Sequence, residues 1–380
     1  MTIVSAFSVS SLKAETISPS YYRKVVQDVF YTYNTYEISK HDPNIDKDKA
    51  KTYLDEVADL TIKISMLTDN FKSFEGVNNV YYINNNVGKT IEIDKLLYDV
   101  LVLAKEYKEL TDGYFDISIG LIIDEWKEII KKGKDLSKTE FNKKVENIKK
   151  IPIIENGIEL SEIDAKYYVK ISEGVKIDLG AIAKGYAVGL VDKYFKDKGL
   201  TYYRIEGSNS SLVYGENYYR DGNFYHVGIN NPFVYNYGYL RVKNVSMTTS
   251  GDTEQNALIH GKLVHHLISP KTKQPENNYR LLTIINDNSA LADALTTAMF
   301  AMDEETLIEW ANDNDINDYI IFKNNEEVIS NFSNFEFVLT KKTKDDPVVA
   351  TLKDWLIVSG IVVFIAGAIY LIARKKEIKE

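Results

Sequence analysis

The sequence predicts an α+β (mixed α/β) fold for most of the chain, followed by one transmembrane helix. Helical and strand patterns alternate along the sequence without a regular βαβ rhythm, which argues against a doubly wound parallel sheet. The 380 residues, of which 44% are hydrophobic, are enough to form a large core. Near the C-terminus, a charge-free apolar run has the length of a helix that spans a bilayer.

Apolar residues at three- and four-residue spacing predict amphipathic helices over residues 49–67 and 94–110. Ser137 and Glu140 form a capping-box pattern that opens a helix toward Lys149. Further helices are expected over 183–199 and, with Ser289 as the cap, over 289–302. Strands are expected at residues 201–207, 224–229, 281–286, 319–323 and 335–340.

The overall composition excludes several classes of function. A formal charge of -9 argues against a nucleic-acid partner, because phosphate backbones are bound by cationic surfaces. The chain has no cysteine, so disulfides, thiol nucleophiles and cysteine-ligated metals are excluded.

The two ends of the chain predict its topology. Residues 355–373 contain no charge and match a transmembrane helix that contacts membrane lipid. The basic residues that follow predict a cytoplasmic tail over 374–380. The domain at 21–340, joined by a polar linker at 341–354, is therefore expected to be extracytoplasmic on a single-pass protein of the cell membrane. Residues 1–20 resemble a leader or the remnant of a signal peptide, although a basic n-region is missing.

Residues 176–189 have the pattern of an anion-binding turn. An apolar strand end is expected to deliver Asp178, and a turn at Gly180 and Ala181 then leads to Lys184 and Gly185 at a helix start. Small residues let a ligand approach the backbone, and a helix N-terminus with a lysine favours an anionic group. An ordinary strand, turn and helix with a surface lysine would show the same pattern.

Two later segments supply candidate ligands. Asp293 and Thr297 are four residues apart, which places both side chains on one face of a helix. A carboxylate and a hydroxyl are hard ligands suited to Mg²⁺, although helix capping and packing are a simpler explanation of the pair. His265 and His266 precede a proline-bounded loop, where most single histidines are structural.

These segments belong to a series of motifs in a definite order: residues 111–116, 178–187, 249–252, 266–272 and 292–298. The series, over about 29–302, resembles the ApbE family of FAD:protein FMN transferases, and residues 75–84 resemble its N-terminal flavin-side region. The resemblance implies an ApbE-like (T-fold-like) catalytic domain. It also implies transfer of FMN from FAD to a Ser or Thr hydroxyl of a flavoprotein at the outer membrane face, with release of AMP.

The resemblance also implies roles for single residues. Asp178 and Lys184 would contact FAD, with Lys184 near the pyrophosphate. Mg²⁺ would be held by the following groups: the carbonyl of Ala181, Asp293 and Thr297. The flavin pocket would be lined by Tyr114, Phe115, Asp116 and Leu267. His266 is the candidate base for the acceptor hydroxyl, and Asp252 is a rival base or an orienting partner.

Departures from the family pattern leave alternatives open. The family's Gly-Gly-Asn turn is replaced by Gly207-Ser208-Asn209, and Ser269 replaces a carboxylate after His266. An FAD pyrophosphatase that releases free FMN would use the same site with water as the acceptor. A membrane-anchored FAD-binding protein without turnover is a second alternative.

Overall fold

The computed structural model describes residues 20–339, apart from residues 209, 230, 234–236 and 254. Its α-helices are α1 (Lys47–Thr68), α2 (Val80–Asn84), α3 (Lys95–Leu110), α4 (Gly120–Lys132), α5 (Lys138–Lys150), α6 (Ala183–Asp197), α7 (Ser289–Phe300) and α8 (Glu304–Asp313). Short 3-10 turns lie at Gly133–Asp135 and Asp221–Asn223.

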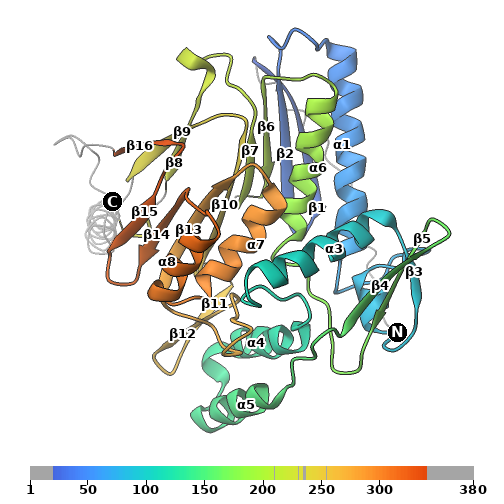
Figure 1. Cartoon of the computed structure of the whole chain (residues 1–380), viewed down its shortest axis with the longest axis vertical. Coiled ribbons are helices and arrows are strands. Elements are labelled where there is room, and N and C mark those ends of the chain that lie inside the picture. Colours follow the sequence, from blue (N-terminus) through green and yellow to red (C-terminus); the bar gives the residue numbers. More distant parts are fainter. Residues whose placement is uncertain (1–19, 209, 230, 234–236, 254, 340–380) are drawn as a thin grey trace, which may run out of the picture.

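One large sheet forms the centre of the molecule (Figure 1). Its strands, in spatial order, are β1 (Tyr21–Val29), β2 (Thr32–Ser39), β6 (Tyr203–Gly207), β7 (Ser211–Tyr214), β10 (Val245–Gly251), β13 (Tyr279–Asn286), β14 (Tyr319–Lys323) and β15 (Val328–Asn331). All neighbouring strands pair antiparallel. This arrangement is that of an α+β fold, as the sequence predicts.

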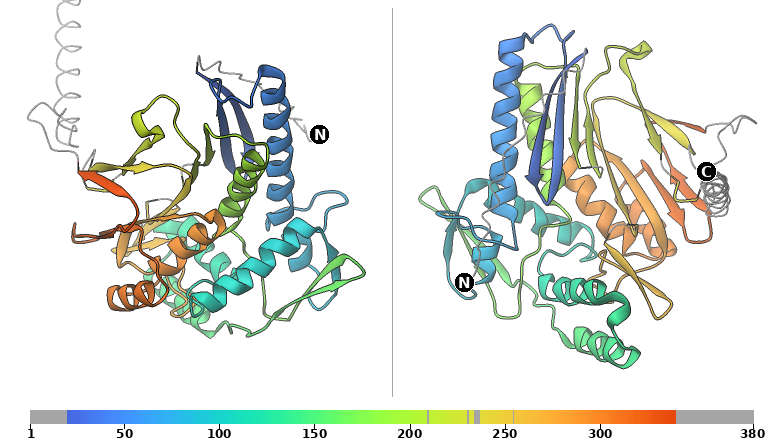
Figure 2. Two further views of the ribbon diagram at one scale, coloured as in Figure 1. Left: turned by 45° about the horizontal axis from the view of Figure 1, so that its top comes forward. Right: turned by 180° about the vertical axis from the view of Figure 1, so that it is seen from behind.

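Three smaller sheets surround the large one (Figures 1 and 2). The first joins β3 (Ile91–Ile93), β5 (Lys166–Ile171) and β4 (Ile158–Ile163). The second is the hairpin of β11 (Asn256–Ile259) and β12 (Lys262–His265). The third has the order β16 (Glu336–Leu339), β9 (Gly238–Val242) and β8 (Tyr225–Ile229).

The two faces of the large sheet carry different layers. Helices α1, α6 and α7 cover one face (Figure 1), where Leu282 and Ile284 of β13 join the apolar core of α7. Met247 of β10 and Ile285 of β13 instead pack with Tyr225 and Leu240 of the third small sheet. Because successive strand side chains point to opposite faces, this small sheet covers the side of the large sheet away from α7.

Most of the predicted helices and strands are present, with small shifts at their ends. The capping box of Ser137 and Glu140 is present at the start of α5. The cap of α7 is a correction: Asn288, not Ser289, accepts hydrogen bonds from the first backbone amides, and α7 ends at Phe300. Because the asparagine oxygen already serves these amides, Ser289 becomes the first helical residue.

Several of the sequence predictions fall on residues that the structure does not describe. The leader at 1–19, the linker at 341–354, the transmembrane helix at 355–373 and the basic tail at 374–380 lie outside the described residues. Within the described part of the chain, no helix combines the length and the apolar character needed to cross a bilayer.

Candidate active site

A cavity of about 800 Å³ lies where the loops before α6 and after β12 meet the large sheet. This volume is in the usual range for sites that bind cofactors. The cavity brings together nearly all of the predicted site residues, which come from four separate segments of the chain. They are Tyr114, Phe115, Asp116, Asp178, Ala181, Lys184, His266, Leu267, Asp293 and Thr297.

The contact between α6 and α7 positions the centre of this site. The backbone N–H of Gly185 donates a hydrogen bond to Oδ2 of Asp293 at 2.8 Å. A Cβ atom on Gly185 would lie 2.3 Å from the carbonyl oxygen of Ser289 and 2.6 Å from Cβ of Asp293. Only glycine therefore allows the two helix starts to approach this closely. The motif with Lys184 and the motif with Asp293 thus form one structural unit.

Asp293 is a buried carboxylate with an incomplete set of partners. Burial raises its pKa, while the positive charge of Lys184 and the Gly185 N–H act in the opposite direction. Within the described residues, Lys184 makes no hydrogen bond or ion pair, so its ammonium group is available to an anion in the cavity. The half-buried Thr297 lies one helical turn after Asp293 and also lines the cavity.

The donor set around Asp293 fits a magnesium ion. A carboxylate oxygen, a hydroxyl and the backbone carbonyl of Ala181 are hard oxygen ligands, and an ion held by so few protein groups keeps open positions. No group of three or more His, Asp or Glu side chains suited to a metal occurs among the described residues.

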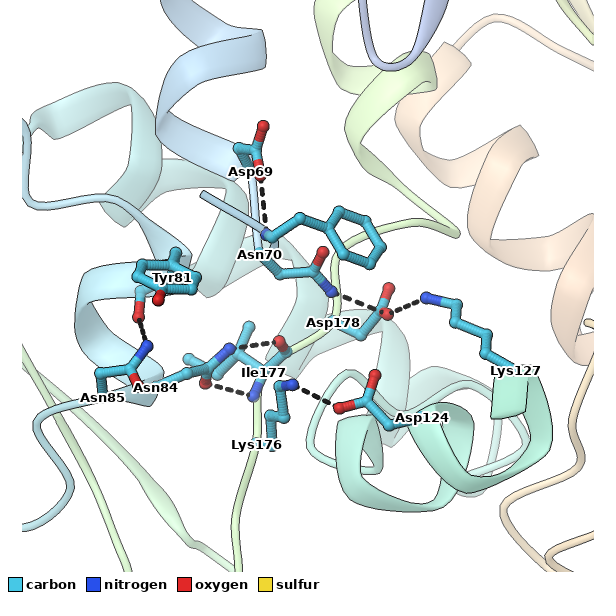
Figure 3. Close-up of polar contacts among 11 residues, drawn as sticks. Asp69, Asn70, Tyr81, Asn84, Asn85, Asp124, Lys127, Lys176, Ile177 and Asp178 are labelled. Carbon is cyan, nitrogen blue, oxygen red and sulfur yellow. Dashed lines mark hydrogen bonds and ion pairs between the residues drawn. The ribbon is translucent and has the colours of Figure 1, made fainter. Parts of the chain in front are cut away.

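The turn at Asp178 is held by a polar network (Figure 3). Oδ1 of Asp178 accepts a hydrogen bond from the Gly180 N–H at 2.8 Å, and Oδ2 accepts from Asn70 at 2.9 Å and Lys127 at 3.0 Å. The strand expected before Asp178 is not formed. In its place, Lys176 makes an isolated bridge with Ile119. These partners fix the carboxylate at the cavity wall.

The two adjacent histidines differ in environment. His265 is fully buried, with Nε2 2.9 Å from the carbonyl oxygen of Glu276 and Nδ1 accepting the N–H of Leu267 at 3.2 Å. Burial lowers its pKa to about 4, so the ring is neutral and structural. His266 is half-buried and lines the cavity, as the proposed base requires.

His265 should make folding stability depend on pH. Because its folded pKa of about 4 lies below the ordinary 6.5, its contribution is present above pH 6.5 and is lost as the pH falls toward 4. The shift corresponds to about 3 kcal/mol. We expect His265→Gln to lose less stability than the wild type between pH 6.5 and 4 in denaturant titrations. Parallel losses in both proteins would contradict this assignment.

The segment predicted to line the flavin pocket is firmly anchored. Oδ2 of Asp116 lies 2.8 Å from Nζ of Lys108, and Oδ1 accepts the N–H of Ser118 at 2.8 Å. Phe115 is buried, and Nζ of Lys271 lies 5.4 Å from the ring centre of Tyr114. Tyr114 is thus the member of this segment that presents an aromatic face near the cavity, while Asp116 holds the loop in place.

Asp252 is the one predicted site residue outside the cavity lining. Its carboxylate is buried, and Nε of Arg280 donates to it at 2.9 Å. Burial raises its pKa and the guanidinium of Arg280 opposes that effect. This geometry is that of an orienting pair rather than of a base that reaches a ligand.

Comparison with known proteins identifies the family of this chain. The model of the ApbE family matches residues 32–320, which is well over half of the chain. The chain belongs to the ApbE family.

Individual relatives of this ApbE protein support the same assignment. The FAD:protein FMN transferase of Haemophilus influenzae is 24% identical over 255 residues, which cover 66% of this chain and 72% of that protein. The FAD:protein FMN transferase of Chlamydia muridarum is 26% identical over 290 residues, which cover 73% and 84% respectively.

Solved structures of ApbE proteins share the fold. The ApbE protein of Thermotoga maritima aligns with a TM-score of 0.66 at 22% identity, covering 82% of this chain and 97% of that chain. The flavinyl transferase ApbE of Pseudomonas stutzeri aligns with a TM-score of 0.65 at 17% identity, covering 84% and 95%. The predicted ApbE-like fold is therefore confirmed.

The structure also places the positions where this ApbE chain departs from the family pattern. Ser208 has a φ angle of 57°, in the left-handed region, at a position where the family pattern has glycine. Ser269 is buried but does not line the cavity, and its hydroxyl has no partner among the described residues. These departures change turns around the cavity rather than its lining.

Several lining residues of the ApbE cavity were not predicted. Asn70 and Lys127 hold Asp178 from segments far away in sequence, so no local pattern identifies them. The tip of the β1–β2 hairpin places Tyr31 beside Phe71, with ring centres 5.2 Å apart. Residues 227–229 of β8 complete the far side of the cavity.

Proposed function

We propose that this chain is an Mg²⁺-dependent FAD:protein FMN transferase whose acceptor is a Ser or Thr hydroxyl of an extracytoplasmic flavoprotein. The observation that supports it best is the unit formed by α6 and α7. There, Lys184, with no partner among the described residues, and the buried Asp293 line one cavity with Thr297 and His266. This combination of a cation, hard oxygen ligands and a histidine suits transfer of a phosphoryl-linked group.

Different residues of the chain bind different parts of FAD. Lys184 neutralises part of the charge of the pyrophosphate, and the N-terminus of α6 adds its positive dipole. Asp293, Thr297 and the carbonyl of Ala181 hold Mg²⁺, which when bound supplies a Lewis acid for the phosphate oxygens. Tyr114 and Leu267 exclude water from the flavin side of the cavity.

The transfer step exchanges one phosphorus–oxygen bond for another. The hydroxyl oxygen of the acceptor attacks the FMN phosphorus, and the bond between this phosphorus and the bridging oxygen of the pyrophosphate breaks. The products are a phosphoester-linked FMN and AMP. His266 takes the proton of the hydroxyl, because it is the histidine that lines the cavity.

Product analysis with and without an acceptor tests this function. The purified chain is incubated with FAD and Mg²⁺, and with a flavinylation-competent acceptor protein in one arm only. We expect AMP and an FMN adduct of the acceptor by mass spectrometry. Free FMN formed at full rate without an acceptor would indicate an FAD pyrophosphatase, and tight FAD retention without AMP would indicate a binding protein.

The proposed location follows from the sequence at the C-terminus. Residues 355–373 would anchor the chain in the lipid bilayer, with the basic tail in the cytoplasm and the catalytic domain outside. Protease added to intact cells is expected to digest the domain, and a protected domain would contradict the proposed orientation.

Lys184→Ala should weaken FAD binding. Loss of one charged hydrogen bond to the pyrophosphate corresponds to about a 10- to 100-fold rise in the FAD dissociation constant. Fluorescence titration of FAD measures this change. Lys193→Ala on the same helix is the matched control, because Lys193 pairs with Asp197 at 2.8 Å on the surface and does not line the cavity. An unchanged dissociation constant for Lys184→Ala would remove this lysine from the pyrophosphate site.

A further inference from the structure

Strand β8 (Tyr225–Ile229) forms one wall of the cavity. Three consecutive residues, Val227, Gly228 and Ile229, all line the cavity. Val227 and Ile229 lie on the same face of the strand, and Gly228 between them has no side chain, so the cavity reaches the backbone of β8 at Gly228.

One edge of β8 has no strand beside it in the part of the chain that the structure describes. The small sheet has the order β16-β9-β8, so β8 pairs only with β9. No backbone hydrogen bond from residues 225–229 to any other described segment is present. Proteins usually protect such edges with lysine, with proline or with a covering segment. Strand β8 contains neither lysine nor proline.

Gly228 makes the edge especially accessible. It is exposed, and a Cβ atom built on it would have no atom within 4 Å. A glycine in the middle of a strand weakens that strand and often marks a place where another backbone approaches closely.

The cavity floor next to β8 is suited to a peptide rather than to a phosphate. Met247, Leu212 and Leu281 supply apolar surface. The hydroxyls of Thr249 and Thr283 bond to each other at 2.8 Å. No charged side chain lies among these residues, so the pyrophosphate of FAD is expected to bind at Lys184 instead.

The same floor leads to the metal-binding residues. Ser250, next to Thr249 in β10, donates a hydrogen bond to Oγ1 of Thr296 at 2.9 Å. Thr296 directly precedes Thr297 in α7, which lines the cavity with Asp293. A chain lying along β8 therefore runs toward the proposed site of phosphoryl transfer.

We propose that the acceptor protein binds as an extended segment that adds a strand to the free edge of β8 and directs its hydroxyl toward Asp293 and Thr297. Main-chain hydrogen bonds supply the affinity, as in other cases of strand addition to a sheet edge. The proposal rests on the transferase function, because it names the binding mode of that reaction's second substrate.

Single proline substitutions on β8 test this binding mode in the full chain. Backbone N–H groups alternate between the two edges of a strand, so one of Val227→Pro and Gly228→Pro removes a hydrogen bond to β9 and the other removes only a free donor. The variant with a wild-type melting temperature is the informative one. The same pair of substitutions at Ser161 and Glu162, on the edge strand β4 away from the cavity, is the matched control.

Two measurements on the informative variant decide the proposal. We expect KM for a purified acceptor protein to rise by about tenfold, as for the loss of one or two hydrogen bonds, with an unchanged dissociation constant for FAD. A synthetic peptide that spans the acceptor residue, with that residue changed to alanine, should inhibit the wild type but lose potency against the variant.

Other outcomes would overturn the binding mode. An unchanged KM for the acceptor would show that the edge of β8 is not used, and a weakened affinity for FAD would show that FAD occupies this part of the cavity. Failure of the proposed function has a different signature, because the wild type itself would then form no FMN adduct with the acceptor.

Discussion

Asp293→Asn is expected to lower the rate of FMN transfer by about 10²–10³-fold. Removal of one preorganised group that stabilises developing charge has an effect of this size. The asparagine keeps the shape of the side chain and an oxygen that can accept the Gly185 N–H. It removes the negative charge, and a neutral amide is a poor ligand for Mg²⁺. Rates are measured as AMP release at several Mg²⁺ concentrations.

The same substitution should not harm the fold. Burial raises the pKa of Asp293, so its ionised form opposes folding once the pH rises above the ordinary value for a carboxyl group. The free energy of unfolding of the asparagine variant at neutral pH should therefore be equal to or greater than that of the wild type. Wild-type transfer at limiting Mg²⁺ would exclude Asp293 as a metal ligand.

Asp192→Asn is the control for Asp293→Asn, since both residues are buried carboxylates on the paired helices. Asp192 accepts the hydroxyl of Tyr203 at 2.6 Å and pairs with Lys196 at 2.7 Å, and it lies outside the cavity. Asp192→Asn should lower the free energy of unfolding and leave the rate of FMN transfer per folded molecule unchanged. The opposite effects of the two variants separate a ligand from a structural carboxylate.

The sequence signals at the centre of the candidate site are local. The spacing of Asp293 and Thr297 places both on one helix face, and Lys184 directly precedes the glycine at the helix contact, but only the family resemblance gave these residues a role. The start of helix α5 could likewise be predicted from the sequence, because its capping box is a pattern of four residues. Such features need no knowledge of the rest of the fold.

The outer parts of the site depend on contacts between distant segments. Asn70 and Lys127 bond to Asp178, from which they are 108 and 51 residues away in the sequence. No local pattern in either segment predicts these contacts. The neutral state of His265 likewise arises from burial in the folded chain. The edge of β8 is visible only once the order of the strands is known.

Gly185→Ala should destabilise the protein by about 1–3 kcal/mol, as expected for an extra carbon in a closely packed contact. Its Cβ would lie 2.3 Å from the carbonyl oxygen of Ser289 and 2.6 Å from Cβ of Asp293, neither of which is the end of a flexible chain. Helices α6 and α7 must therefore separate, which lengthens the hydrogen bond from Gly185 to Asp293. Urea titration and AMP release measure the two effects.

Gly189→Ala, one turn further along α6, separates this steric effect from the general effect of removing a glycine from a helix. The new Cβ there would lie 3.4 Å from Oγ of Ser289 and 3.6 Å from its Cβ, close to ordinary packing distances. Alanine also favours the helix over glycine by about 0.5–1 kcal/mol. Stability should thus fall with Gly185→Ala and stay level or rise with Gly189→Ala. Equal effects at both positions would mean that the close approach of α6 and α7 does not determine the geometry of the site.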